Sequence, residues 1–324
     1  MNILVTGATG KVGQTFIQRF LSGQNEGTIR AFCHNRVVEE TDRVSIVKGD
    51  ISNRSDVQKA MDGITHVVHL ATCKETPDDV MDVTVKGLFW LLEEARECDI
   101  FKQFILIGGD AAMGHFIYPY DIPVTEQHPF RPYQGCYALS KVLEECMLEQ
   151  YYTQYDLNGC CLRAPWIMEK DDFKYTLTFT KDVFGGPRWC DLVDPGQAKE
   201  YAETETVPLL RDPDGNPVKL NFVHVEDLVS AILKAIDHPK AKQQLFHVCM
   251  DEPVDYGEVA TYLNKTRNLP SVNIDSKFHS TWLDNTKTKL LLDWRPKYDL
   301  AKLIDSSWDY ARSADDVRKI LYPG

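Results

Sequence analysis

A tyrosine and a lysine one helical turn apart are the residues best suited to chemistry in this sequence. Tyr137 and Lys141 fall on the same face of a helix predicted from Tyr137 to about Tyr152. A phenol with its ordinary pKa of about 10 is a poor acid or base at neutral pH. A nearby ammonium lowers that pKa, so the pair can exchange a proton with an alcohol or a carbonyl. An exposed helix pair without function is the alternative, because YxxxK is common by chance.

A glycine-rich segment near the N-terminus gives a second functional pattern. The apolar run Ile3–Val5 ends in the glycine loop Thr6–Gly13, TGATGKVG, and a helical pattern follows. Glycines permit a tight turn, and the N-terminus of a helix offers free N–H groups to a pyrophosphate. A glycine-rich turn that binds nothing is the alternative. We predict that a dinucleotide binds here, through Gly7, Thr9, Gly10, Lys11, Val12 and Gly13.

The end of the second predicted strand, Thr28–Cys33, bears on which nicotinamide cofactor binds. An acid at this point accepts hydrogen bonds from the ribose 2′-hydroxyl of NAD(H). This chain has His34, Asn35 and Arg36 instead. Because a guanidinium can pair with a 2′-phosphate, NADP(H) is favoured and NAD(H) is the alternative. Further contacts are predicted from Asp50 and Ile51 beside the adenine, and from Leu70, Ala71 and Thr72 beside the ribose.

Strands and helices take turns along the part of the chain that must position these residues. This alternation predicts an α/β fold of the Rossmann type, a doubly wound parallel sheet with helices on both faces. The loop Gly108–Gly135 is long and proline-rich, as functional loops often are. The predicted strands are Ile3–Val5, Thr28–Cys33, Val44–Val47, His66–Leu70, Phe104–Ile107, Gly159–Leu162 and Leu220–Val225; helices are predicted over Val57–Met61, Val83–Cys98, Tyr137–Tyr152 and Leu228–Ile236.

The hydrophobic periodicity weakens after Pro165, where a smaller substrate-binding lobe is expected. We predict a Rossmann dinucleotide-binding domain over residues 1–165, to which residues 220–249 return. The lobe then comprises residues 166–219 and 250–324.

Composition excludes several classes of protein. Of 324 residues, 43% are hydrophobic and 26% charged, as in ordinary globular chains. The net charge of -12 disfavours nucleic-acid and membrane-surface partners. The nine cysteines form no CxxC pair or spaced Cys/His set. We therefore expect no metal site, and we expect the thiols to be reduced. No apolar run is long enough to span a bilayer and no leader peptide is evident, so we expect a cytoplasmic protein.

Several motifs together are similar to those of the extended short-chain dehydrogenase/reductase family, the NAD-dependent epimerase/dehydratase group. They are TGATGKVG at 6–13, GDI at 49–51, HLAT at 69–72, YALSK at 137–141, LRAP at 162–165 and FVHVEDL at 222–228. The resemblance implies that Tyr137 is the acid/base and that Lys141 orients the nicotinamide ribose. It also places Pro165 beside the cofactor, implies a C-terminal lobe that closes over a sugar, and makes a homodimer the expected assembly.

The sequence departs from that family at the loop after the fifth strand. Gly108 and Gly109 stand where the family usually has a serine or threonine that hydrogen-bonds the reacting oxygen. Asp110 is the nearest polar side chain, and Thr125 is a second candidate. An anionic Asp110 cannot donate to an alkoxide, so it would be protonated, act through water or bind a substrate hydroxyl.

Two further departures concern the substrate. By our alignment Trp166 and Leu220 replace an asparagine and an arginine that often hold nucleotide sugars in this family. Losing a bidentate phosphate anchor argues against a nucleotide sugar. Trp166 is equally suited to stacking on a sugar ring or to a buried core. Predicted substrate contacts, each also compatible with a plain surface role, are Lys74, His115, Tyr133, Trp166, Lys181 and Arg188, with Trp189 as a further possibility.

Three hypotheses of function follow. The first is an NAD(P)-dependent oxidoreductase that acts on a small polyhydroxylated substrate (free sugar, sugar acid or lactone), with Tyr137 as acid/base. The second is a nucleotide-sugar epimerase similar to UDP-glucose 4-epimerase. The third is a regulatory cofactor-binding protein with little catalysis, motivated by Gly108-Gly109. The intact Tyr137/Lys141 pair and the missing phosphate anchor favour the first.

Overall fold

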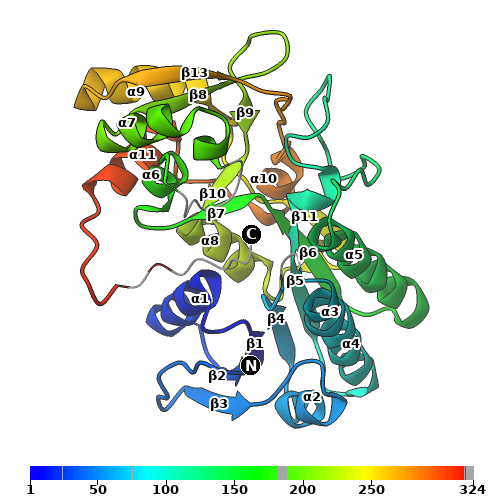
Figure 1. Ribbon diagram of the computed structural model, residues 1–324. Helices are drawn as coiled ribbons and strands as arrows, with labels where there is room; N and C mark the ends of the chain where they lie inside the picture. The colour runs from blue at the N-terminus through cyan, green and yellow to red at the C-terminus, as the bar shows by residue number, and fades with distance from the viewer. Residues whose placement is uncertain (24, 74–75, 181–187, 317, 319–324) are drawn as a thin grey trace.

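A parallel sheet of seven strands forms the centre of the molecule (Figure 1). The computed structural model describes residues 1–23, 25–73, 76–180, 188–316 and 318. The strand order β11-β6-β5-β4-β1-β2-β3 confirms the predicted α/β fold of the Rossmann type. The strands are β1 (Asn2–Thr6), β2 (Thr28–Cys33), β3 (Val44–Lys48), β4 (His66–His69), β5 (Gln103–Gly109), β6 (Gly159–Ala164) and β11 (Gln244–His247).

Helices cover both faces of this sheet because each presents one apolar stripe to it. Helices α1 (Lys11–Ser22) and α8 (Val225–Ala235) pack together on one face. There Phe16, Phe20 and Ile232 are fully buried. The other face carries α2 (Arg54–Met61), α4 (Gly87–Glu97) and α5 (Cys136–Tyr155), with Leu88, Leu92 and Leu148 in the core.

A smaller lobe lies at one end of the sheet, beyond the carboxyl ends of the strands (Figure 1). Its own core contains Phe173, Trp189, Phe222 and Tyr256. The lobe elements are α6 (Asp172–Thr176), α7 (Pro195–Glu203), α9 (Tyr256–Arg267), α11 (Leu300–Asp309) and the two-stranded pairs of β8 (Val207–Arg211) with β13 (Ser271–Asp275), β9 (Lys219–Leu220) with β12 (Val254–Asp255), and β7 (Trp166–Met168) with β10 (Phe222–His224).

Two predicted elements differ from the structure in an informative way. The strand predicted over Leu220–Val225 is two strands, because the Asn221 side chain bonds across to residues 281 and 283 and β9 and β10 take different partners. The helix predicted over Val83–Cys98 begins earlier, at α3 (Pro77–Asp79), and passes through a π-helix, η1 (Val80–Lys86), before α4. The remaining short elements are η2 (Asp110–Met113), η3 (Trp189–Asp191), η4 (Pro239–Ala241) and α10 (Thr286–Leu292).

Candidate active site

The glycine loop between β1 and α1 has the geometry of a phosphate cradle. Gly7 adopts a φ of +64°, and a β-carbon there would lie 2.9 Å from the backbone of Leu70 and Ala71. A β-carbon on Gly13 would lie 2.5 Å from the Gly7 carbonyl oxygen. Gly10 is the N-cap of α1 and, as a glycine, has no side chain to bond the first-turn amides, which point out of the helix end. The loop therefore fits a pyrophosphate, as the sequence predicts.

Lys11, one of the predicted cofactor residues, sends its side chain in another direction. Its ammonium donates to the Ile167 carbonyl oxygen at 3.2 Å and forms an ion pair with Asp172 of α6. The side chain is buried, and it ties the glycine loop to the lobe. The predicted contact of Lys11 with a phosphate thus rests on its backbone amide in the first turn of α1.

The segment after β2 lies at the surface, with His34, Asn35 and Arg36 exposed. Arg36 makes no ion pair within the described part of the chain, so its guanidinium is available to an anion. Asp50 accepts a hydrogen bond from the Ser52 amide at 2.8 Å, which lowers the pKa of its carboxyl. Ile51 packs against Gly87 and is only 9% exposed, so little of its side chain is accessible to a cofactor.

The turn after β4 is organised by a single hydroxyl. Thr6 Oγ1 accepts hydrogen bonds from the amides of Leu70 and Ala71, each at 3.1 Å. It bonds His69 Nδ1 at 2.8 Å. Burial, with the charge of Lys141, lowers the pKa of His69 to about 3, so this imidazole is neutral. Thr72 follows, half-buried, at the carboxyl edge of the sheet.

Tyr137 and Lys141 lie together beside the end of β5. The Lys141 ammonium is 5.5 Å from the centre of the Tyr137 ring. A β-carbon on Gly109 would lie 3.5 Å from the Tyr137 hydroxyl and 3.3 Å from Lys141 Cδ. A side chain at this position would therefore meet the phenol directly. Because residue 109 is glycine, no side-chain hydroxyl at this position can contact the Tyr137 phenol.

A buried acid that the sequence analysis missed adjoins the lysine. Glu144 Oε2 lies 2.8 Å from Lys141 Nζ. Burial raises the pKa of the Glu144 carboxyl, and the ammonium opposes that rise. The i to i+3 spacing on one helix was the signal that could have identified this pair.

A second buried network, also missed, fastens the long loop to the sheet. Arg163 of β6 donates from Nε and Nη2 to the Glu145 carboxylate at 3.0 and 2.6 Å, and from Nη1 to His247 Nε2 at 2.8 Å. The His247 amide donates to Glu126 of the loop at 3.0 Å. Burial raises the pKa of Glu126. These contacts hold the carboxyl ends of β6 and β11 against α5 and the long loop.

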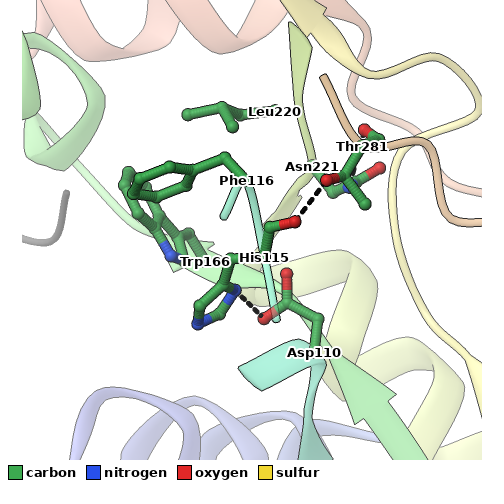
Figure 2. A pocket seen from close by; sticks show the side chains of 7 residues that line it. All are labelled: Asp110, His115, Phe116, Trp166, Leu220, Asn221 and Thr281. Carbon is green, nitrogen blue, oxygen red and sulfur yellow. Dashed lines mark hydrogen bonds and ion pairs between the residues drawn. The ribbon is translucent and has the colours of Figure 1, made fainter. Parts of the chain in front are cut away.

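Asp110 and His115 form a close pair in a small pocket next to Gly109 (Figure 2). His115 Nδ1 lies 2.7 Å from Asp110 Oδ1, an ion-pair contact in which the ring nitrogen is poorly aligned for a hydrogen bond. The His115 ring stacks on Tyr133 at 5.2 Å between centroids. Aromatic groups form one wall of the pocket, whose full lining is Asp110, His115, Phe116, Trp166, Leu220, Asn221 and Thr281.

The lobe closes this pocket through Asn221 and Thr281, neither of which belongs to a motif identified in the sequence. Asn221 donates to the Thr281 carbonyl oxygen at 2.9 Å and accepts from the Leu283 amide at 3.0 Å. The Thr281 hydroxyl donates to the His115 carbonyl oxygen. Together these bonds join the long loop to the lobe around the pocket.

The predicted substrate contacts divide into three groups. Trp166 lines the pocket, with its ring 6.0 Å from Phe116 and 5.4 Å from Phe222, and Tyr133 lies behind His115. Arg188 is half-exposed, pairs with Asp191 and does not line the pocket. Lys74 and Lys181 fall outside the described residues.

Trp189 and Thr125, two further candidates, have partners elsewhere. Trp189 is buried, with Nε1 donating to the Thr176 carbonyl oxygen, so it belongs to the lobe core. Thr125 interacts with His128 at 3.1 Å and does not line the pocket. Pro165 is buried between β6 and β7, and its predicted place beside the cofactor stays a prediction.

Neither metal ligation nor membrane insertion is indicated by the described residues. They contain no group of three histidine, cysteine, aspartate or glutamate side chains arranged to hold a metal ion. Within the same residues, every helix is too short or too polar to cross a bilayer.

Comparison with known proteins agrees with this geometry. Residues 3–168 match the model of the NAD dependent epimerase/dehydratase family. The chain is 26% identical to the UDP-glucose 4-epimerase of Mycolicibacterium smegmatis, over 97% of this chain and 99% of that protein. It is 24% identical to the L-arabinose 1-dehydrogenase (NAD(P)(+)) of Haloferax volcanii, over 69% of this chain and 89% of that protein.

A solved structure shows the same fold. A short-chain dehydrogenase/reductase superfamily protein from Agrobacterium tumefaciens, with bound NAD, superposes with a TM-score of 0.79. The match covers 95% of this chain and 96% of that one, at 22% sequence identity.

Proposed function

The chain belongs to the NAD-dependent epimerase/dehydratase family, and on that premise we propose that it is an oxidoreductase acting on a small polyhydroxylated substrate: a free sugar, a sugar acid or a lactone. The observation that carries the proposal is the lining of the pocket beside Gly109. Among the residues that the structure describes, this lining contains aromatic and apolar groups, one acid, one imidazole, one amide and one hydroxyl, and neither lysine nor arginine. A nucleotide sugar would need a cation there for its diphosphate.

The proposed chemistry assigns one role to each member of the helical pair. A bound nicotinamide supplies the acceptor for the substrate's hydride. Tyr137, as phenolate, accepts the proton of the substrate hydroxyl, and as phenol it returns a proton in the reverse direction. The Lys141 ammonium, 5.5 Å from the ring, stabilises the phenolate. Asp110 holds the pocket's imidazole at 2.7 Å.

For the cofactor we propose NADP(H), with NAD(H) also accepted. The exposed Arg36, and the absence of an acid among His34, Asn35 and Arg36 after β2, support the phosphorylated form. The related L-arabinose 1-dehydrogenase is named for both forms, whereas the Agrobacterium structure holds NAD. We further propose that the lobe, predicted as residues 166–219 and 250–324 and joined in the structure by β9 and β10, binds the substrate.

The second candidate is a nucleotide-sugar epimerase. Its specific support is the match to a UDP-glucose 4-epimerase over 97% of the chain. In that case the hydride returns to the substrate and no net cofactor reduction accumulates. The apolar Leu220 in the pocket lining counts against it.

A homodimer is a further proposal. Met81 and Phe89, from η1 and α4, and Leu139 of α5 are exposed apolar side chains on helices that pack together. Trp90, by contrast, is occupied by its own chain, since its Nε1 donates to the Ser52 carbonyl oxygen. Sedimentation velocity tests this interface: we expect the wild type to be a dimer and the F89D/L139D variant to be a monomer.

One assay distinguishes the two activities. Purified protein is given NAD or NADP with each of a panel of free sugars, sugar acids, polyols and UDP-sugars, and absorbance at the reduced-nicotinamide band is followed. Cofactor reduction with a non-nucleotide sugar is the expected result. Conversion of a UDP-sugar without net reduction would establish the epimerase instead. Tight cofactor binding with no turnover of any substrate would favour a regulatory protein.

A further inference from the structure

The glycine at position 109 leaves the reacting oxygen without its usual hydrogen-bond donor. A β-carbon at this position would lie 3.5 Å from the Tyr137 hydroxyl, so it faces the place where proton transfer is proposed. A substrate oxygen that loses its proton to Tyr137 develops negative charge, and a preorganised donor lowers the cost of that charge. Another group must therefore supply the donor.

The next polar side chains along the chain form a fixed pair. Asp110 follows Gly109 directly, and its side chain is 7% exposed. Its Oδ1 lies 2.7 Å from His115 Nδ1. The 3-10 helix that carries Asp110, η2, packs against α5, which carries Tyr137. Asp110 is thus on an element that packs against the helix carrying Tyr137, and His115 follows it two residues after η2 ends.

Several independent contacts hold the His115 ring in place. The backbone has a φ of +46°, and its carbonyl oxygen accepts from the Thr281 hydroxyl of the lobe. The ring stacks on Tyr133 and meets Trp166 edge-on. Nδ1 faces Asp110, whereas Nε2 points away from that carboxylate (Figure 2). An oriented imidazole with one free nitrogen is what a hydrogen-bond donor to substrate requires.

We propose that His115, positioned by Asp110, donates from Nε2 to the reacting oxygen of the substrate in place of the missing serine or threonine. The proposal rests on the proposed oxidoreductase function. The proposal assigns His115 the imidazolium form, in which both ring nitrogens carry a hydrogen and Asp110 carries the opposite charge. His115 keeps its Nε2 proton throughout; the proton that moves passes between the substrate hydroxyl and Tyr137.

Charged and titratable groups from several elements lie near the pair. Among the described residues they include Tyr133 of the long loop, Tyr137 and Lys141 of α5, and Cys249 after β11. Burial raises the pKa of the Cys249 thiol, and the Asp110 charge adds to that rise, so the thiol is neutral. Asp110, whose Oδ1 lies 2.7 Å from Nδ1, is the carboxylate that faces the imidazole.

A rescue experiment tests the donor directly. H115F keeps a ring for stacking and removes both nitrogens; we expect kcat to fall about 100-fold or more, with KM changed only a few-fold. G109S in the H115F background restores the hydroxyl at the family position, and we expect at least a ~10-fold recovery of kcat. G109A in the same background is the matched control, since it differs from G109S by one oxygen, and it should not recover.

Either of two results would overturn the proposal: H115F within about threefold of wild-type kcat, or equal recovery by the serine and alanine variants. Thermal unfolding checks that each variant folds. If H115F does not, H115N replaces it, because asparagine tolerates a positive φ and is too short to place a donor at the Nε2 position.

A second readout needs no turnover and separates this proposal from the proposed function. The ring nitrogens of His115 are observed by NMR at neutral pH, assigned by the loss of their signals in H115F or H115N. In wild type we expect both nitrogens to carry a hydrogen, and in D110N we expect one of them to lose it, because the carboxylate opposite the imidazolium is gone. The same protonation in both proteins refutes the Asp110–His115 pairing, even if no substrate has been found.

Discussion

Glu144 Oε2 lies 2.8 Å from Lys141 Nζ, and the two side chains are only 1% and 4% exposed. A carboxylate and an ammonium so completely removed from water compensate each other's desolvation. The lysine assigned to the phenolate thus depends on a neighbour one turn further along the same helix. Removing either partner alone leaves an unpaired buried charge.

The first prediction concerns the stability of this pair. E144Q should lower the free energy of unfolding by about 3–5 kcal/mol, the usual cost of breaking a buried ion pair. The double variant K141M/E144L removes both charges and should recover most of that loss, although not activity. Denaturant unfolding of the three proteins measures the difference. Equal destabilisation of the single and double variants would show that the charges do not compensate each other.

The second prediction concerns cofactor choice. R36A should raise the Kd for NADP(H) about 10- to 100-fold, the value of a lost charge-assisted hydrogen bond, and leave the Kd for NAD(H) within about twofold. Arg36 is exposed, so its loss should not disturb the fold. Fluorescence titration with both reduced cofactors gives the two constants. Parallel changes in both constants would place the 2′-phosphate away from Arg36.

The third prediction concerns the glycine loop. A β-carbon in G13A would lie 2.5 Å from the Gly7 carbonyl oxygen and 2.7 Å from Ala8 Cα, atoms of a backbone that cannot easily move. We expect cofactor affinity to fall at least about 100-fold, because the loop must open. G196A in α7 is the control, because a β-carbon there meets nothing within 4 Å. Unchanged cofactor affinity in G13A would argue against the loop as the phosphate site.

The fourth prediction is a pH dependence of stability due to His69. Burial lowers the pKa of folded His69 to about 3, from 6.5. As pH falls below 6.5 the unfolded chain binds a proton that the folded chain refuses, so stability is lost toward acid. For this group the loss is about 2 kcal/mol between pH 7 and pH 5.

H69Q isolates that contribution, because glutamine does not titrate. Urea unfolding of wild type and H69Q at pH 7 and pH 5 should show the wild type losing about 2 kcal/mol more than the variant. A difference between the two proteins that is the same at both pH values would mean that His69 takes up a proton in the folded state.

Local sequence patterns were sufficient for the glycine loop and for six strands of the sheet, whereas β11 was not predicted and Leu220–Val225 lies outside the sheet. The strand Thr28–Cys33 was predicted at its observed bounds because apolar, β-branched runs between turn residues identify strands. The pocket was harder to predict from the sequence. Asp110 and His115 are five residues apart, and only the turn at Gly114 (φ +82°) brings them together. Asn221 and Thr281 meet through a lobe whose packing no local pattern records.

Buried charge was also hard to anticipate. Glu144 and Glu145 are adjacent acids that a helical pattern would place partly in solvent, yet both are buried, one on Lys141 and the other on Arg163. The partner of Glu145 depends on the packing of β6 against α5, whereas that of Glu144 lies three residues away on the same helix. Trp189 shows the converse: an aromatic residue suited to a sugar lies in the lobe core.

The most direct test of the central claim is the rate of cofactor reduction by wild type and Y137F, with the best sugar or sugar acid found in the panel. Y155F, at the exposed far end of the same helix, is the matched control. If Tyr137 moves the proton, Y137F should lose about 10²- to 10⁴-fold in kcat while Y155F keeps the wild-type rate. Turnover of Y137F near the wild-type rate would contradict the account.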